Sequence, residues 1–304
     1  MNSQIQQKYF KTFDGHKIGY QVMGKGKKPF VLCNGLGGSA IAWKPIVDQF
    51  QNEYRFITWD YCGLFSSETK DTPDDLRIER HVKDMEALLK HEGIKKAVFG
   101  AWSMGVQVCL DYYRDHSEQY QGMVLFNGAA GEPYNTVLNS KLSKFVLPVL
   151  NQQIIRLMPI MQPRLQPLAE LVVDHKEFIR IIKRLKIVHQ NLDTEIFRQV
   201  ALSMMKTNLT VYHHILECLS LHDASDVLPH IEIPTLVMAG SRDVLTPQKV
   251  AESMVEQIPH AELLVLPQGS HYMLLEFPEW INKRLDQFLN EHQLIGKRKK
   301  SQKT

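Results

Sequence analysis

The chain has 304 residues, of which 44% are hydrophobic and 23% charged, a composition typical of a folded protein rather than a disordered one. Its formal net charge is +3, but five basic residues lie in the last eight positions, which leaves 31 basic against 33 acidic residues elsewhere. We therefore expect the segment 295–304 to be a disordered basic tail, with contact to an anionic lipid surface as the alternative, and we expect no nucleic-acid partner.

The first half of the chain alternates between strand-like and helix-like segments after an initial hairpin. An Asp-Gly pair at 14–15 separates two strand-like segments and supplies the backbone conformation that a tight turn needs. Nearly continuous apolar strands are predicted at 30–34, 55–60, 96–100 and 122–128, with helices near 39–50, 76–91 and from about 103. Such strands are typical of a parallel sheet with helices on both faces, an α/β fold.

The alternation stops near Gly131 and later resumes, with strands at 233–240 and 261–267 and helices opening at Pro247 and about Pro278. The intervening residues are rich in Leu, Ile, Met and Val and are typical of helices. We therefore predict a core formed by 1–131 and 226–294, with a helical cap inserted at 132–225.

One segment of the predicted cap, 175–190, has the spacing of an amphipathic helix. Its predicted apolar face comprises Phe178, Ile181, Ile182, Leu185 and Val188. We interpret this face as packed within the cap, and weak contact of the helix with a membrane surface is the alternative. The sequence does not indicate an oligomeric state.

The remaining composition features favour a cytoplasmic protein without cofactors. The first fifteen residues lack a basic stretch followed by an apolar one, so no secretory signal is expected, and the apolar segment 145–161 is interrupted and too short to span a bilayer.

The four cysteines are scattered and predict reduced thiols and no metal site; they are Cys33, Cys62, Cys109 and Cys218. The glycine-rich loop at 34–38 lacks the full dinucleotide-binding pattern, so no cofactor is expected.

The sequence AWSMG at 101–105 lies between a predicted strand and a predicted helix. Ser103 has small residues two positions before and after it, and a sharp strand-to-helix turn needs small side chains there because neighbouring backbone passes close by. Ser103 is therefore a candidate nucleophile, and a serine that merely begins a helix is the alternative. An activated serine also needs a base, a group that orients the base, and donors for the oxyanion.

Candidates for the base and the orienting acid follow late strands. His271 comes after the strand at 261–267 and a Gln-Gly-Ser loop, and a neutral histidine base predicts an acid limb in the rate–pH profile near ~6.5. Asp243 follows the strand at 233–240, and a helix cap or turn is its alternative role. Another possible position for the acid follows the apolar residues 122–126, but Asn127 and Gly128 occupy it.

Two backbone N–H groups are candidate donors to the oxyanion. One belongs to Met104, directly after the serine, and the other to Leu36, in the glycine-rich loop. The serine turn and the chain order Ser103, Asp243, His271 resemble the α/β-hydrolase superfamily, in its branch with a helical cap. The resemblance implies an α/β-hydrolase fold in which the serine attacks, the histidine relays the proton, the aspartate orients the histidine, and the two N–H groups hold the oxyanion.

Two motifs depart from the pattern of this superfamily. The oxyanion loop begins with Asn34-Gly35 where members often have His-Gly, and we expect this change to alter the polar support of the loop. The segment DYCGLFS at 60–66 has Cys62 where members often have arginine, which we expect to alter loop packing. We interpret Cys62 as a packing residue, with a reactive thiol as the alternative.

A serine nucleophile implies acyl transfer, and we predict a carboxylic ester hydrolase, esterase-like or lipase-like, that acts on a small-molecule acyl ester. The cap methionines favour a medium or long acyl chain, unless they only bury the cap against the sheet; they are Met158, Met161, Met204 and Met205. Thioesterase, acyltransferase and cofactor-free haloperoxidase activities remain open on the same triad. An alternative of another class is a non-catalytic binder of a small hydrophobic ligand under the cap.

Overall fold

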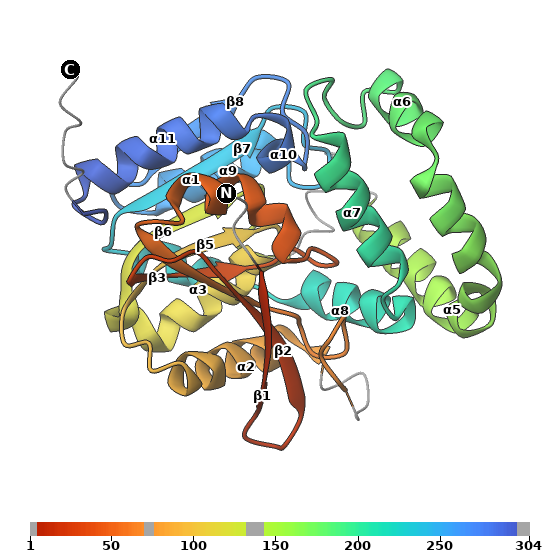
Figure 1. The fold of residues 1–304 in the computed structure, drawn as a ribbon, viewed down its shortest axis with the longest axis horizontal. Coiled ribbons are helices and arrows are strands. Elements are labelled where there is room, and N and C mark those ends of the chain that lie inside the picture. Colours follow the sequence, from red (N-terminus) through yellow and green to blue (C-terminus); the bar gives the residue numbers. More distant parts are fainter. Residues whose placement is uncertain (1–4, 70–75, 132–142, 297–304) are drawn as a thin grey trace.

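The computed structural model describes residues 5–69, 76–131 and 143–296, and its centre is an eight-stranded sheet (Figure 1). The strands are, in sheet order, β1 (Gln6–Lys11), β2 (Lys17–Met23), β4 (Tyr54–Trp59), β3 (Lys28–Cys33), β5 (Ala97–Trp102), β6 (Tyr120–Phe126), β7 (Thr235–Gly240) and β8 (Glu262–Leu266). The pairs from β4 to β8 are parallel, whereas β1 and β2 pair in antiparallel fashion and β2 joins β4 in the same way. The predicted hairpin and the predicted mostly parallel sheet are confirmed.

Helices cover both faces of this sheet. They are α1 (Lys44–Phe50), preceded by the short helix η1 (Ala40–Trp43), then α2 (Ile78–His91), α3 (Met104–His116), α9 (Gln248–Gln257), α10 (Met273–Glu276) and α11 (Pro278–Glu291). Buried side chains of α2, α3 and α9 pack on one face, and those of α1 and α11 on the other. Alternate residues of β5 enter the two clusters, Phe99 the first and Val98 the second, which explains why the strand is apolar throughout.

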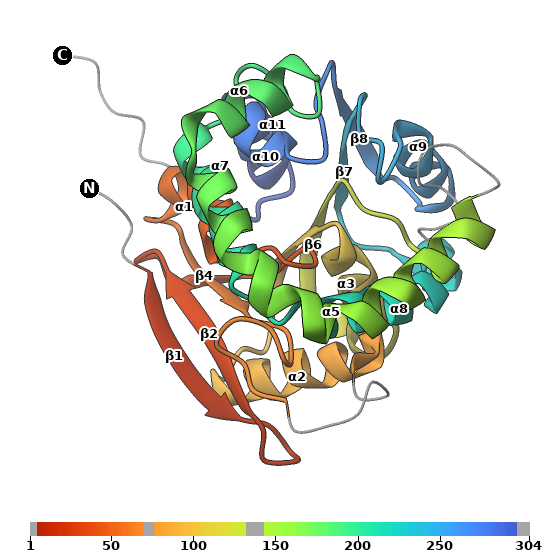
Figure 2. The ribbon, with the colours of Figure 1, turned by 90° about the vertical axis from the view of Figure 1, so that its right-hand side faces the viewer.

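Among the described residues, four α-helices stand between β6 and β7, followed by the short helix η5 (Ser225–His230). They are α5 (Ser143–Asp174), α6 (Lys176–Arg184), α7 (Thr194–Met205) and α8 (Leu209–Leu221). Gly131 and Asp223, on either side of these helices, form an antiparallel β-bridge. Figure 2 shows α5 as the outer layer, crossing in front of α8. Residues 132–142 of the predicted cap and 297–304 of the predicted tail lie outside the described residues.

The prediction of one helix over 175–190 is wrong in its second half. α6 ends at Arg184, because Lys186 adopts the left-handed conformation with φ 58°. The Leu185 N–H still donates to the Ile181 carbonyl at 2.8 Å, but the chain then turns away. Ile181 and Leu185, placed on the buried face by the sequence, are 54% and 65% exposed.

None of the described helices is long and apolar enough to cross a membrane.

Candidate active site

Ser103 occupies a strained turn between β5 and α3. Its φ of 56° and ψ of −120° are rare for a residue with a side chain, and its hydroxyl makes no capping hydrogen bond to the helix. Gly105 allows this turn, because a Cβ at that position would lie 2.2 Å from the Cys33 carbonyl oxygen. Ala101 is likewise fully buried. Ser103 therefore differs from a serine that only begins a helix, because its hydroxyl does not cap the helix.

The structure brings Ser103, His271 and Asp243 together from the ends of β5, β8 and β7. The Nε2 atom of His271 lies 3.0 Å from the Oγ atom of Ser103, and its Nδ1 atom lies 2.7 Å from an oxygen of Asp243. The Asp243 side chain is fully buried and that of His271 is 11% exposed. Both distances are within hydrogen-bonding range, so a proton can pass between serine and imidazole while the carboxylate fixes the ring.

The carboxylate of Asp243 is held by its own turn. Its Oδ1 atom accepts from the N–H groups of Leu245 at 2.8 Å and Thr246 at 3.0 Å, and its Oδ2 atom accepts from the Thr246 hydroxyl at 2.7 Å. One oxygen thus forms the turn, and the other faces His271. The turn contacts and the contact with His271 are therefore made by the same carboxylate.

Asn127, at the end of β6, connects the loops that carry Asp243 and His271. It is buried, with φ 40°; its side-chain amide donates to the Ser270 carbonyl at 2.8 Å, and its oxygen accepts from the Gly240 N–H at 2.8 Å. From the sequence, this residue was notable only because it is not an acid. A polar side chain at the end of a buried strand was the signal that could have identified it.

Glu276 is a buried carboxylate that sequence reasoning missed. It accepts from the Ser270 hydroxyl at 2.6 Å and the Ser270 N–H at 2.8 Å, and also from the His189 N–H at 2.7 Å. His189 belongs to the connection between α6 and α7. This carboxylate therefore joins the His271 loop to the inserted helices.

The loop at 34–38, which carries the candidate donor Leu36, lies directly beside the serine. A Cβ at Gly35 would be 3.2 Å from the Ser103 Cβ. The other candidate donor, Met104, begins α3 immediately after the serine. No acceptor for the N–H of Leu36 or Met104 is found within the described residues. Both groups are available to a negatively charged oxygen bound at Ser103.

The Asn34 side chain satisfies its hydrogen bonds inside the core. Its amide donates to the Trp59 carbonyl at 2.8 Å, its oxygen accepts from the Trp43 indole at 2.8 Å, and the Tyr61 hydroxyl donates to the Asn34 carbonyl at 2.6 Å. The departure from His-Gly therefore supplies a polar support of its own, which fixes the start of the loop at 34–38.

The ring of Tyr61 packs against the ring of His81, with the two ring centroids 4.7 Å apart. Burial and the nearby charge of Arg80 lower the pKa of His81 to about 3, so this histidine stays neutral in the fold, whereas an unfolded histidine binds a proton below pH ~6.5. Acid should therefore favour the unfolded chain. Relative to a His81→Phe variant, the wild-type protein should lose about 1.4 kcal/mol of unfolding free energy per pH unit below ~6.5.

Urea unfolding of both proteins at pH ~7.5 and ~5 measures this difference, which should change by about 2 kcal/mol between the two values. The exposed His230 provides the matched control, since a His230→Gln variant should follow the wild type at both pH values. If the difference in unfolding free energy between the wild type and His81→Phe does not change with pH, the His81 ring takes up its proton in the folded protein as well.

Cys62 is fully buried, and its thiol donates to the Glu68 carbonyl at 3.3 Å. Burial raises the pKa of this thiol to about 11, which disfavours the reactive thiolate and supports the packing interpretation. All four cysteines are free. Among the described residues, no group of three or more His, Cys, Asp and Glu side chains could hold a metal ion.

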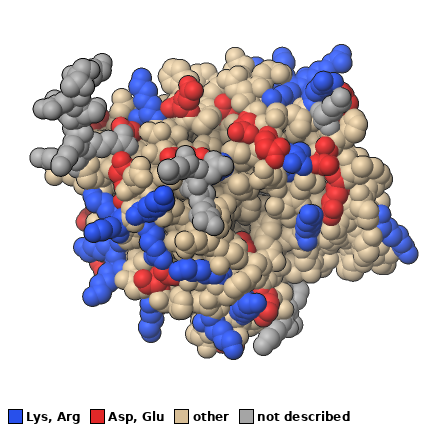
Figure 3. Space-filling model, in the orientation of Figure 1, with Lys and Arg blue, Asp and Glu red and all other residues tan. Residues whose placement is uncertain are grey.

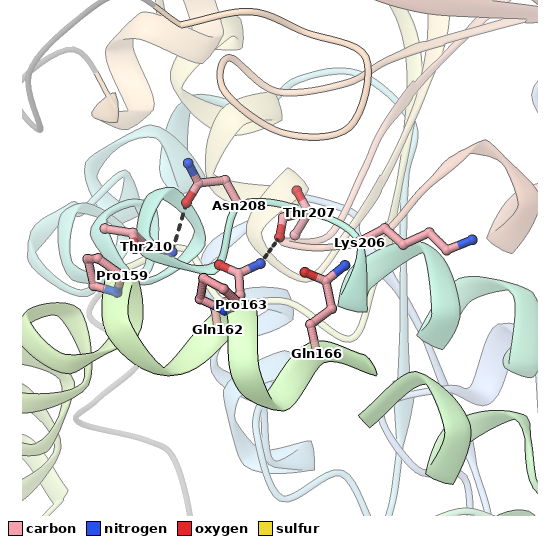
Figure 4. A pocket seen from close by; sticks show the side chains of 8 residues that line it. All are labelled: Pro159, Gln162, Pro163, Gln166, Lys206, Thr207, Asn208 and Thr210. Atoms are coloured by element: carbon pink, nitrogen blue, oxygen red, sulfur yellow. Dashed lines mark hydrogen bonds between the residues drawn. The ribbon is translucent and has the colours of Figure 1, made fainter. Parts of the chain in front are cut away.

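Apolar side chains of α7 and α8 lie over the oxyanion loop. A Cβ at Gly37 would be 3.0 Å from the Tyr212 ring and 3.3 Å from the Met204 side chain. A groove of about 640 Å³ lies between α5 and the α7–α8 connection (Figure 4). Its lining residues are Pro159, Gln162, Pro163, Gln166, Lys206, Thr207, Asn208 and Thr210, and none of them belongs to the candidate triad.

The fold and the serine turn are those of a known class of protein, and comparison with known sequences identifies it. The family described as alpha/beta hydrolase fold matches residues 28–278, and the chain belongs to this family. The structure is similar to the crystal structure of the enol-lactonase from Burkholderia xenovorans, with a TM-score of 0.72 and 21% sequence identity, over 93% of this chain and 100% of that one.

Two curated relatives align over most of their length. A pimeloyl-[acyl-carrier protein] methyl ester esterase of Hamiltonella defensa is 24% identical over 250 residues, which are 82% of this chain and 87% of the relative. A 3-oxoadipate enol-lactonase 2 of Acinetobacter baylyi is 25% identical over 270 residues, which are 88% of this chain and 91% of the relative. The α/β-hydrolase fold expected from the sequence is thus confirmed.

Proposed function

We propose that this protein is a serine hydrolase that cleaves a carboxylic ester of a small molecule through an acyl-enzyme intermediate. The observation that carries the proposal is the continuous hydrogen-bonded chain from Ser103 through His271 to Asp243. The names of the two curated relatives, a methyl ester esterase and an enol-lactonase, support hydrolysis of an ester bond.

In the first half of the reaction, the Ser103 oxygen attacks the ester carbonyl carbon while His271 Nε2 takes the hydroxyl proton. The carbonyl oxygen becomes an oxyanion, which the N–H groups of Leu36 and Met104 stabilise. The C–O bond to the alcohol then breaks, and His271 gives its proton to the departing oxygen. Asp243 stabilises the imidazolium that exists between these two proton transfers.

In the second half, water attacks the acyl-enzyme carbonyl carbon and gives its proton to His271. The ester bond to Ser103 breaks, the serine oxygen recovers that proton, and the carboxylic acid leaves. An alcohol or thiol in place of water would make the same site an acyltransferase. Hydrolysis is proposed because of the relatives' activities.

We further propose that residues 132–225 act as a cap over this site and that the acyl chain is of medium or long length. Met204 and Tyr212, close to Gly37, are apolar side chains that such a chain could contact, and methionine adapts to irregular apolar ligands. The strained conformation of Ser103 argues against a non-catalytic binder, since a binder has no use for a costly backbone geometry that exposes a hydroxyl.

Labelling with a fluorophosphonate, read by mass spectrometry, tests the nucleophile directly. We expect one label per chain at Ser103 and turnover of p-nitrophenyl esters, fastest between the octanoate and the palmitate. Fastest turnover of the acetate would contradict the proposed acyl length. A folded protein that takes no label would contradict the serine mechanism and favour the ligand-binding alternative.

A further inference from the structure

The outermost inserted helix, α5, exposes most of its large apolar side chains. Its side toward the protein holds Ile155, Val173 and two amides. Gln162 donates to the Thr207 carbonyl at 2.7 Å (Figure 4) and accepts from the Leu209 N–H at 3.0 Å, and Asn151 donates to the His213 carbonyl at 3.0 Å. A helix on the surface of a water-exposed protein normally buries its apolar side and exposes its polar one.

The outward side of α5 is apolar over its whole length. Twelve large hydrophobic residues of this helix are more than a third exposed: Phe145, Val146, Val149, Leu150, Ile154, Leu157, Ile160, Met161, Leu165, Leu168, Leu171 and Val172. The surface over α5, on the right of Figure 3, is accordingly mostly free of charged side chains. We call these twelve residues the α5 face. A continuous exposed apolar surface of this kind marks an interaction site.

Two arginines lie among these apolar residues, and the acidic residues of α5, Glu170 and Asp174, stand at its C-terminal end, where Asp174 pairs with Arg198. Arg156 and Arg164 are exposed and lie at helical spacing from Ile160 and Leu168, so they share the α5 face, and residues 145–169 contain no Asp or Glu. A basic helix with an exposed apolar side is typical of segments that lie in the surface of an anionic bilayer, where the arginines contact lipid phosphates and the apolar side chains enter the acyl region.

We propose that the α5 face docks on the surface of an anionic lipid bilayer. A second copy of this chain fits less well, because a symmetric dimer centred on residues 145–169, which contain no acid, would bring the arginines of the two copies together. The bilayer supplies both the apolar environment and the negative charge. The α11 end of the molecule, which precedes the basic tail, is far from α5 (Figure 1).

Docking would orient the candidate active site. α5 packs on α7 and α8, and those helices carry Met204 and Tyr212 over the oxyanion loop. The inserted helices would then lie between the bilayer and Ser103, so that esters dissolved in the bilayer approach from the side of α5. This consequence rests on the proposed function, whereas the docking itself does not.

Flotation of the full-length protein with vesicles tests the docking. We expect it to float with vesicles of phosphatidylcholine plus phosphatidylglycerol, and much less with phosphatidylcholine alone. Replacing three residues of the α5 face, Leu157→Gln, Ile160→Gln and Leu168→Gln, should lower the partition coefficient more than about tenfold. The matched control is Trp280→Gln on α11, a residue that is 64% exposed and should change binding less than about twofold.

A second pair of variants tests the charge. Arg156→Gln with Arg164→Gln should remove most of the preference for phosphatidylglycerol, whereas Lys299→Gln with Lys300→Gln in the tail should not. Ser103→Ala should float like the wild type, which separates lipid binding from hydrolysis. Equal binding to both vesicle types, no binding to either, or a dimer in lipid-free solution that the triple variant dissociates would each overturn the proposal.

Discussion

Replacing Ser103 with alanine should lower kcat for a p-nitrophenyl ester by about 10⁴-fold or more, because no other group forms the covalent intermediate. Fold and stability should change little. The hydroxyl bonds only to His271 among the described residues, and alanine at this position keeps the same backbone geometry. Initial rates and thermal unfolding of the two purified proteins measure both effects.

A serine outside the site provides the control for this substitution. Ser253 is exposed on α9, and a Ser253→Ala variant should keep the wild-type rate. Hydrolysis by the Ser103→Ala protein at the wild-type rate would show that the ester is cleaved elsewhere. Loss of the folded state would mean that the hydroxyl supports the turn, and labelling of the wild-type serine would then be the deciding measurement.

The sheet and the serine turn could be predicted because their signals are local. A strand such as β5 is apolar throughout since both of its faces are covered, and the turn at Ser103 needs the small residues that the sequence shows at 101 and 105. The positions of Asp243 and His271 followed from a single rule, that residues after parallel strands gather at one edge of the sheet.

The supports of this site could not be predicted, because their partners are distant in the sequence. Asn127 contacts Gly240 and Ser270, which are 113 and 143 positions away, and nothing near Asn127 indicates these contacts. The end of α6 was missed for a different reason. Lysine at 186 adopts a conformation that usually needs glycine or asparagine, so the sequence carries no stop signal there.

The polarity of α5 shows the limit of counting apolar residues. From the sequence, the many Leu, Ile and Met residues of the insertion were expected to bury the cap against the sheet or to contact an acyl chain. Most large apolar residues of α5 face outward instead, while amides such as Asn151 and Gln162 hold it to its neighbours. Only tertiary contacts reveal which side of such a helix is covered.

Asp243→Asn should lower kcat by about 10³- to 10⁴-fold with the local turn intact. The asparagine oxygen can still accept from the Leu245 and Thr246 N–H groups, which hold it in the Oδ1 position. Its NH₂ group then occupies the Oδ2 position, 2.7 Å from His271 Nδ1 in the wild type. The imidazole must present a lone pair there, so its proton moves to Nε2, and the ring can no longer accept the serine proton.

Rotation of the asparagine amide would not restore the wild-type arrangement, because it would place the NH₂ group against the two N–H donors of the turn.

Two further variants separate orientation of His271 from formation of the turn. Asp243→Ala removes both functions and should lower stability as well as rate, whereas Thr246→Val removes only the hydroxyl at 2.7 Å from Oδ2 and should cost about tenfold in rate or less. Steady-state kinetics with urea unfolding distinguishes the three, and a wild-type rate for Asp243→Asn would show that another group orients His271.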